Sequence, residues 1–395
     1  MQFALLLPEP DRGPGGADWV IAADATAAGL GRAALGAGGS AADAAATTAL
    51  ALAVTLPSRA GFGGGGRCLV VEPPGGRAMV IDFPAVAASV NRDARFRAGV
   101  PAFARGVFAL HARYGRLPWP QVVAPAESLA RFGFVVSPTL ADDLARHGDA
   151  LVNDRAALTA MMVGGRRIAG VGDRLRNRAL ATLIAQLRGR GPGGMYEGGL
   201  AREIADAADA AGLPLTADDL RGAVPAWRDA VTIDTGAATV VIDPAIDLAA
   251  AADPPADLAS GFGTALIATD RDGMVVACAL GLNAPFGVGL AAREHGFLFS
   301  AAPPPDAAPA VLLAERDAAG RQTFLVGSFG GASPAASARR AHRLADDGTI
   351  DAAAFQDADA LAISCDIGLA DPADGCVVLG GGAEYDTPSS AGSGE

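Results

Sequence analysis

Apolar positions in the first half of the chain repeat mostly with helical spacing. Residues 24–56 predict two alanine-rich helices, separated by the glycines at 36, 38 and 39, with Ser40 as the N-cap of the second. Beyond Pro101, as far as about Gly212, the pattern stays helical with polar loops. Examples of the helices predicted there are 103–114, 119–132, 138–147 and 200–211.

Elsewhere the apolar residues are arranged as in strands. The glycine run at 61–66 leads into a hairpin with strands at 68–71 and 79–83. Strands at both ends of the chain, with helices between them, favour one layered α/β domain whose sheets draw on distant segments. The later elements predicted are strands at 264–269, 274–280, 310–313 and 323–326, a helix at 333–344 and a frayed tail after Thr387.

The composition of the 395-residue chain excludes several functional classes. With 51% hydrophobic residues it can bury a large core, and its formal net charge of -12 argues against a nucleic-acid partner. All 31 basic positions are arginine, which excludes a Schiff-base lysine, a phosphate-loop lysine and a Ser–Lys dyad. No apolar run reaches the roughly 20 residues of a membrane span, so we expect no membrane association.

The spacing of cysteine and histidine argues against a metal site. No CxxC or HExxH motif occurs, and the four histidines are far apart. We therefore expect no metal and no cofactor. Free buried thiols in a reducing, cytoplasmic location are favoured over a dense disulfide framework. The four cysteines are Cys68, Cys278, Cys365 and Cys376.

Two glycine-rich segments are candidates for backbone chemistry. Glycines 61, 63 and 66 satisfy GxGxxG, but a helix precedes them and a strand follows, which favours a close-packed turn over a dinucleotide site. Gly330 and Gly331 lie where a strand gives way to the predicted helix at 333–344. Their N–H groups suit an oxyanion hole, and a tight strand-to-helix turn explains the same residues.

Six segments together resemble one family, the gamma-glutamyltranspeptidases, which are N-terminal nucleophile hydrolases. They follow one another in the family's order, from GGSAADAAATTALALAV to GSFGGAS. The resemblance implies a four-layer αββα sandwich, an α/β (α+β) fold formed here by a single unprocessed chain. The segments are 38–54, 61–71, 111–138, 195–220, 269–289 and 327–333.

The resemblance also implies how the chain is divided. Residues 1–380 form one gamma-glutamyltranspeptidase-like domain, in which 1–262 correspond to the large subunit and 263–380 to the small subunit. Residues 381–395 are expected to be a flexible tail.

Family members are usually cut once, so that a new N-terminal threonine becomes the nucleophile, activated by its own α-amino group. Counting back from the turn at 270–273, the family's TTH triplet falls on Gly263, Thr264 and Ala265. Gly263 has no hydroxyl for self-cleavage or for an acyl-enzyme. Thr264 is one residue away, so its side chain lies on the opposite face of the strand. A bulge could turn it to the face where the nucleophile is expected.

The positions that the resemblance assigns to substrate recognition are also altered. Asn283 is retained, but the family's second threonine corresponds to Gly281. The arginine for the glutamyl α-carboxylate falls at Phe83 or Pro84, and the acidic stretch that receives the ammonium is replaced by 298–303. These changes argue against recognition of a γ-glutamyl group.

Two functions from different classes follow. The first is a degenerate, non-catalytic family member that binds a protein partner or a small ligand in a remnant pocket lined by Gly263, Asn283 and the amides of Gly330 and Gly331, as a homo-oligomer or in a complex. The alternative is an active, divergent amide hydrolase or acyl (γ-glutamyl) transferase with Thr264 as nucleophile. A purely structural subunit beside an active paralogue is a third possibility.

Overall fold

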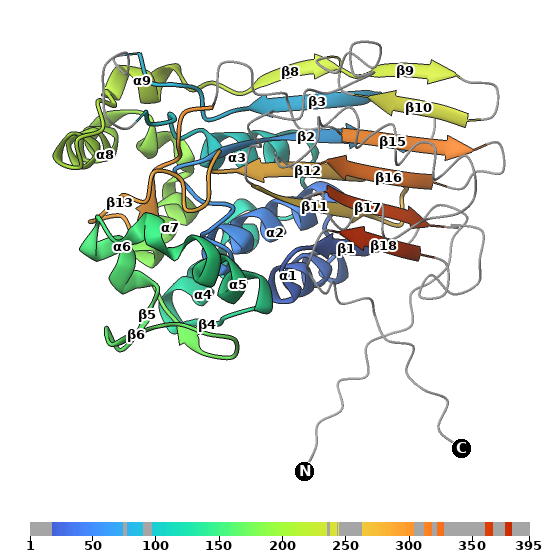
Figure 1. The fold of residues 1–395 in the computed structure, drawn as a ribbon. Coiled ribbons are helices and arrows are strands. Elements are labelled where there is room, and N and C mark those ends of the chain that lie inside the picture. Colours follow the sequence, from blue (N-terminus) through green and yellow to red (C-terminus); the bar gives the residue numbers. More distant parts are fainter. Residues whose placement is uncertain are drawn as a thin grey trace, which may run out of the picture.

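Two antiparallel sheets lie face to face in the computed structural model, and helices cover one of them (Figure 1). The structure describes residues 18–73, 77–89, 97–234, 238–242, 244 and 263–303. It also describes the backbone of four strands at 312–317, 322–327, 360–365 and 376–380. Helices, sheet and sheet thus form three layers, and the helix predicted at 333–344 and the tail at 381–395 lie outside the described residues.

The first sheet joins the beginning of the chain to a hairpin from its second half. The hairpin strands β11 and β12 lie between β1 and β2, so the sheet is completed only when residues about 200 positions apart pair. All neighbours are antiparallel. In order, the strands are β1 (Trp19–Ala22), β11 (Gly263–Thr269), β12 (Val275–Gly281), β2 (Gly65–Val71), β3 (Ala78–Phe83) and β8 (Ala226–Asp229).

The second sheet is also antiparallel and draws mainly on the C-terminal part of the chain. Strand β8 of the first sheet ends at Asp229 and β9 of the second begins at Val231, so at this point of the chain a single residue, Ala230, links one sheet to the other. In order, its strands are β18 (Cys376–Gly380), β17 (Ala360–Cys365), β16 (Gln322–Gly327), β15 (Leu312–Asp317), β10 (Ala238–Ile242) and β9 (Val231–Asp234).

Successive side chains of a strand point to opposite faces of the sheet, and this alternation explains how the layers pack. On β11, Ala265 and Ile267 belong to a small apolar cluster that includes Val241 of the second sheet, so this face packs between the sheets. Leu266 and Ala268 belong to the large cluster formed with the helices. Strand β11 thus has one side that faces the helices and one that faces the second sheet.

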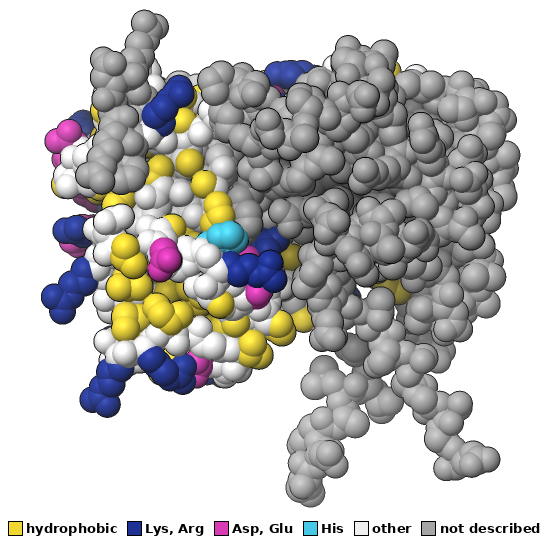
Figure 2. Space-filling model, in the orientation of Figure 1, with side chains coloured by type: hydrophobic (Ala, Val, Ile, Leu, Met, Phe, Trp, Pro, Cys, Tyr) yellow, Lys and Arg dark blue, Asp and Glu magenta, His cyan; other side chains and the backbone are white. Residues whose placement is uncertain are grey.

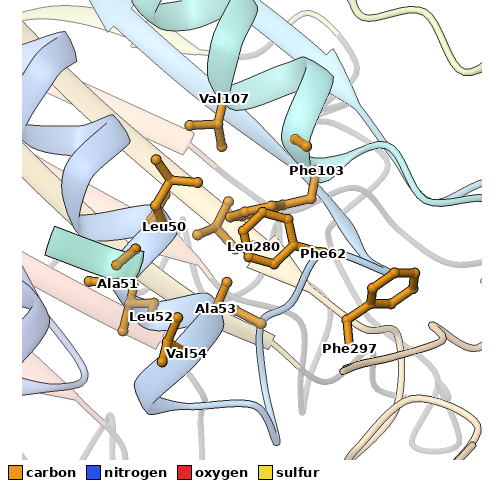
Figure 3. Close-up of a cluster of buried hydrophobic side chains, with 14 of the residues drawn as sticks. Leu50, Ala51, Leu52, Ala53, Val54, Phe62, Phe103, Val107, Leu280 and Phe297 are labelled. Carbon is orange, nitrogen blue, oxygen red and sulfur yellow. The ribbon is translucent and has the colours of Figure 1, made fainter. Parts of the chain in front are cut away.

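The helices confirm most of the sequence-based boundaries. Alanine-rich α2 is buried along its whole length, because small side chains let α1, α3 and α4 approach it closely. Figure 3 shows Leu50 of α2, Val107 of α3 and Leu280 of β12 converging in this core. The helices are α1 (Ala25–Gly36), α2 (Ala41–Thr55), α3 (Phe103–Tyr114), α4 (Trp119–Phe132), α5 (Pro138–His147), α6 (Arg155–Ala160), α7 (Arg178–Arg190), α8 (Gly198–Ala210) and α9 (Ala217–Gly222).

Short elements connect these helices and were not predicted. They are two-residue strands and single 3-10 turns, too short for a hydrophobic period. Among the described helices, none combines the length and the apolar character needed to cross a membrane. The short elements are β4 (Phe134–Val135), η1 (Gly148–Leu151), β5 (Met162–Val163), β6 (Arg167–Ile168), β7 (Arg174–Leu175), η2 (Pro192–Met195), β13 (Ala291–Ala292) and β14 (Phe297–Leu298).

The N-terminus of α2 is held by a buried carboxylate. Ser40 caps the helix as predicted, and Asp43 completes the capping box by accepting a hydrogen bond from the Ser40 N–H at 2.9 Å. The same carboxylate accepts the N–H of Arg116 at 2.7 Å and of Leu117 at 3.2 Å. Asp43 therefore fixes the loop after α3 to the start of α2.

One expectation about cysteine is wrong. Cys68 on β2 and Cys278 on β12 occupy directly opposite positions and form a disulfide, so neither is a free thiol. The two residues are 210 positions apart in sequence, and only the pairing of β2 with β12 brings them together. Spacing rules that look for nearby cysteines cannot detect such a pair.

Candidate active site

Three glycines stand side by side at one end of the first sheet. Gly263 begins β11, Gly281 ends β12 and Gly65 begins β2, and the register places Gly263 opposite Gly281 and Gly281 opposite Gly65. All three are buried. They share the face of Ala265 and Ala279, which packs toward the second sheet. We call these three residues the glycine row; it carries no side chain at the position where the family's threonine is expected.

Thr264 lies on the other face of β11. It shares the face of Leu266 and Ala268, which belong to the core formed with the helices. Its register partner is Leu280, which in turn pairs with Gly66. The side chain is 3% exposed, and its Oγ1 has no hydrogen-bond partner among the described residues. No bulge interrupts the pairing of β11 with β12. Thr264 is thus directed away from the face that carries the glycine row.

Asn283 connects three segments to which the resemblance assigns substrate recognition. Its backbone has a φ of 61°, and its Nδ2 donates to the carbonyl oxygens of Ala301 at 2.9 Å and Ala85 at 3.3 Å. Ser300 Oγ lies 3.4 Å from the same nitrogen. The segments after Phe83, around Asn283 and at 298–303 are therefore brought together, as the resemblance implies. The amide group that would meet a substrate already binds the protein's own backbone.

Phe83 is part of the hydrophobic core. It is 1% exposed, and a Cβ built on Gly106 of α3 would lie 2.1 Å from its Cγ, so glycine is needed for the ring to fit under the helix. The N–H of Val86 donates to the carbonyl of Pro84 in a tight turn. Neither position supplies a cation.

A cation missed by the sequence analysis lies on the neighbouring strand. Arg67 is directly opposite Asp82 on β3, with its Nε 3.0 Å from Oδ1 and one terminal nitrogen 2.9 Å from Oδ2. Arg228 of β8 also reaches Asp82 at 3.2 Å. Arg67 shares the face of Gly65, two residues along β2. Its signal in the sequence was a charge inside an otherwise apolar strand.

The glycine run before β2 is a site of close backbone packing. A Cβ on Gly63 would lie 2.1 Å from the carbonyl oxygen of Leu298, and one on Gly64 would lie 2.2 Å from that of Gly281. Any larger residue would push β14 or the end of β12 away. The interpretation of this run as a close-packed turn is confirmed.

A pocket of about 110 Å³ lies on the helical side of the first sheet. Alanines from α2, α6 and α7 line much of it, and Arg176, Asn177 and Arg293 add the polar groups. Leu282 contributes to the wall, whereas Gly263 and Asn283 do not. This pocket is therefore distinct from the remnant pocket expected at the glycine row.

The turn between β13 and β14 carries a buried histidine beside this pocket. His295 is 7% exposed, stacks on Phe297 with 6.5 Å between ring centroids, and its Nε2 lies 4.0 Å from a carboxylate oxygen of Glu203. Burial lowers the pKa of the imidazole, and the charges of Glu203 and Glu294 oppose that shift. The ring is thus favoured in its neutral form.

The remaining predicted site residues, Gly330 and Gly331, lie outside the described residues. Their placement next to the start of β11, and their role as an oxyanion hole, stay predictions. The described part of the candidate site consists of the glycine row, Thr264 on the reverse face and Asn283 bound to backbone.

Comparison with known proteins connects this geometry to one family. The sequence profile described as gamma-glutamyltranspeptidase matches residues 27–250. Glutathione hydrolase 3 of Arabidopsis thaliana is 30% identical over 233 residues, which cover 56% of this chain and 36% of that protein. The glutathione hydrolase proenzyme of Escherichia coli is 32% identical over 218 residues, covering 51% and 37%. The matched region thus spans about a third of the length of these relatives.

Solved structures extend the likeness to nearly the whole chain. Cephalosporin acylase from Bacillus halodurans superposes with a TM-score of 0.70 at 18% identity, covering 98% of this chain and 99% of that one, which shows the shared fold. The gamma-glutamyltranspeptidase of Helicobacter pylori has a TM-score of 0.53 at 25% identity, covering 59% and 71%. The fold is therefore that of the N-terminal nucleophile hydrolases, and the described residues supply one helical layer and both sheets. Because the profile covers more than half of its length, this chain belongs to the gamma-glutamyltranspeptidase family.

Proposed function

We propose that this protein is a non-catalytic member of its family, which acts by binding a small ligand or a protein partner. The observation that carries the proposal is the glycine row, with Gly263 at the first position of β11. An N-terminal nucleophile needs a hydroxyl or thiol at that residue, both to cut the chain and to form the acyl-enzyme. Without one, we expect the chain to remain uncut.

The recognition side of the site supports the same conclusion. The side-chain amide of Asn283 donates to the carbonyls of Ala85 and Ala301, and Phe83 is packed under α3. The nearest described cation on the inter-sheet face, Arg67, is already in an ion pair with Asp82. On the inter-sheet face, the residues that the structure describes thus offer a free α-amino acid head group no uncompensated cation. We therefore expect no saturable binding of glutathione or glutamate at millimolar concentration.

Binding to a protein partner is supported by the surface of the helical layer. Phe132 at the end of α4 is 70% exposed, Val135 of β4 is 47% exposed, and Val171, which precedes β7 in the chain, is 64% exposed. Figure 2 shows apolar patches among charged side chains on the described part of one face. Exposed apolar groups that gather in this way are typical of interaction sites.

The alternative enzyme would use Thr264. Its Oγ1 is free of hydrogen bonds among the described residues, as an unengaged nucleophile would be. It is, however, buried against the helical core, so attack from it requires β11 to shift by one residue. Such a shift would expose Leu266 and Ala268 to the inter-sheet face and disrupt both clusters.

Intact mass after reduction, combined with turnover of a chromogenic γ-glutamyl anilide, tests the proposal. Reduction is essential, because the Cys68–Cys278 disulfide joins the segments on either side of Gly263 and would hide a cut in an unreduced sample. We expect one full-length chain and no turnover. Two chains after reduction, with Gly263 or Thr264 as a new N-terminus, would overturn the proposal. So would turnover by the uncut chain that disappears in Thr264→Val.

A further inference from the structure

Each of the two stacked sheets contains one pair of cysteines at directly opposite positions. In the first sheet the register pairs Cys68 with Cys278, and these residues form a disulfide. In the second sheet the register pairs Cys365, the last residue of β17, with Cys376, the first residue of β18. The four residues are all the cysteines of the chain.

Backbone geometry alone allows a bond at the second pair. Directly opposite residues of antiparallel strands have Cα atoms about 4.5 Å apart in one kind of pair and about 5.5 Å in the other. Both spacings fall within the roughly 4.4 to 6.8 Å found across disulfides. Either kind of pair therefore permits a disulfide.

The position of the pair in the chain also favours bond formation. Cys365 and Cys376 are 11 positions apart (376 minus 365), so they meet through a short loop within one hairpin. A short loop keeps the effective concentration of one thiol near the other high even before the sheet is complete. Cys68 and Cys278, by contrast, come together only when β12 pairs with β2.

We propose that Cys365 and Cys376 form a second disulfide, which fastens β18 to β17 at the end of the second sheet. The oxidant is a disulfide, either of a protein dithiol oxidant or of a low-molecular-weight thiol. The thiolate of one cysteine attacks it, giving a mixed disulfide and releasing one thiolate of the oxidant. The thiolate of the other cysteine then attacks the protein sulfur of that mixed disulfide and releases the second. Two thiol protons and two electrons leave the protein. They reduce a protein oxidant to a dithiol, or a low-molecular-weight disulfide to two separate thiols.

This pairing would leave the mature protein without a free thiol. Two stable disulfides are typical of proteins that fold in an oxidising compartment. The expected cytoplasmic location rested in part on free thiols, and the Cys68–Cys278 bond removes that part of its basis. The second bond would also hold β18, whose outer edge has no neighbour in the described sheet order and would otherwise be free to fray.

The test uses the full chain, exported to an oxidising compartment of the expression host and trapped with acid and an alkylating reagent during lysis. One portion of the acid-quenched sample is left unalkylated and is denatured for thiol counting. Ellman's reagent should find no thiol in this portion before reduction and four thiols after reduction. Two thiols before reduction would overturn the proposal. So would a disulfide-linked dimer through Cys365 or Cys376 on a non-reducing gel.

Peptide mapping locates the bond without any variant. A protease that cuts before aspartate separates residues 359–365 from 374–385, because Asp366, Asp371 and Asp374 lie between the two cysteines. The two peptides should appear as one species that separates only on reduction. Alkylated Cys365 and Cys376 in the unreduced digest would contradict the proposal. Two variants serve as matched controls. Before reduction, Cys365→Ser should contain one free thiol, whereas the double variant Cys365→Ser with Cys376→Ser should contain none.

Discussion

Cys68 and Cys278 are bonded across strands β2 and β12, and Gly263 lies between them in the sequence. The bond joins the part of the chain that the resemblance assigns to the family's large subunit to the part that it assigns to the small subunit. A cut before Gly263 would therefore leave both pieces covalently attached. Any assay of chain integrity must break this bond first.

Removing the hydroxyl of Thr264 is expected to stabilise the protein. Thr264→Val preserves the shape of the side chain and eliminates a buried oxygen that has no hydrogen-bond partner among the described residues. We expect a gain of about 1 kcal/mol in the free energy of unfolding, measured by chemical denaturation. Thr264→Ser, which keeps the hydroxyl and loses the methyl group, is the control and should destabilise. A loss of stability in Thr264→Val would show that the oxygen has a partner.

Two glycine-to-alanine changes inside helices should have opposite effects. In α3, Gly106→Ala would bring a methyl group to 2.1 Å from Phe83 Cγ, and overpacking of this kind costs about 1 to 3 kcal/mol. In α1, the nearest atom to a Cβ on Gly29 is the tip of Arg32 at 3.8 Å, so Gly29→Ala should gain about 0.5 to 1 kcal/mol. Thermal unfolding of both variants measures the difference. Equal shifts would mean that Phe83 does not pack under α3.

Asp43 should be among the most sensitive polar residues. It is fully buried and receives the N–H groups of Ser40, Arg116 and Leu117. Asp43→Asn places an amide among these donors and should cost about 3 kcal/mol in unfolding free energy. Asp142→Asn is a suitable control, because its ion pair with Arg146 is exposed and such pairs contribute about 0.5 kcal/mol or less. Similar losses in both variants would contradict the assigned role.

His295 should make stability depend on pH. Its pKa in the folded protein is lowered by burial, so the unfolded chain binds the proton more readily. The contribution of the neutral ring is fully present above the ordinary value of 6.5 and is lost as pH falls through the lower folded value. His295→Gln should therefore flatten the melting temperature between about pH 7 and pH 5 relative to the unaltered protein. An unchanged pH profile would refute this, and His147→Gln controls for the loss of a histidine.

The local pattern of the sequence predicted the helices well, because capping and stop signals lie within a few residues. Ser40, for instance, marks the start of α2. Long-range pairing was invisible to such rules. The Cys68–Cys278 bond and the Arg67–Asp82 ion pair depend on which strands become neighbours. The assignment of Gly263 to the nucleophile position depends on the turn at 270–273, which gives a fixed point from which to count.

The single residue between β8 and β9 limits how the two sheets can move. Asp229 belongs to one sheet and Val231 to the other, so Ala230 leaves no spare length for one sheet to slide over its neighbour at that edge. Figure 1 shows the two strands end to end along one border. Because Ala230 holds the two sheets together at this border, we expect the space between them to widen least there. The gap would grow with distance from Ala230, toward the side where β11 lies.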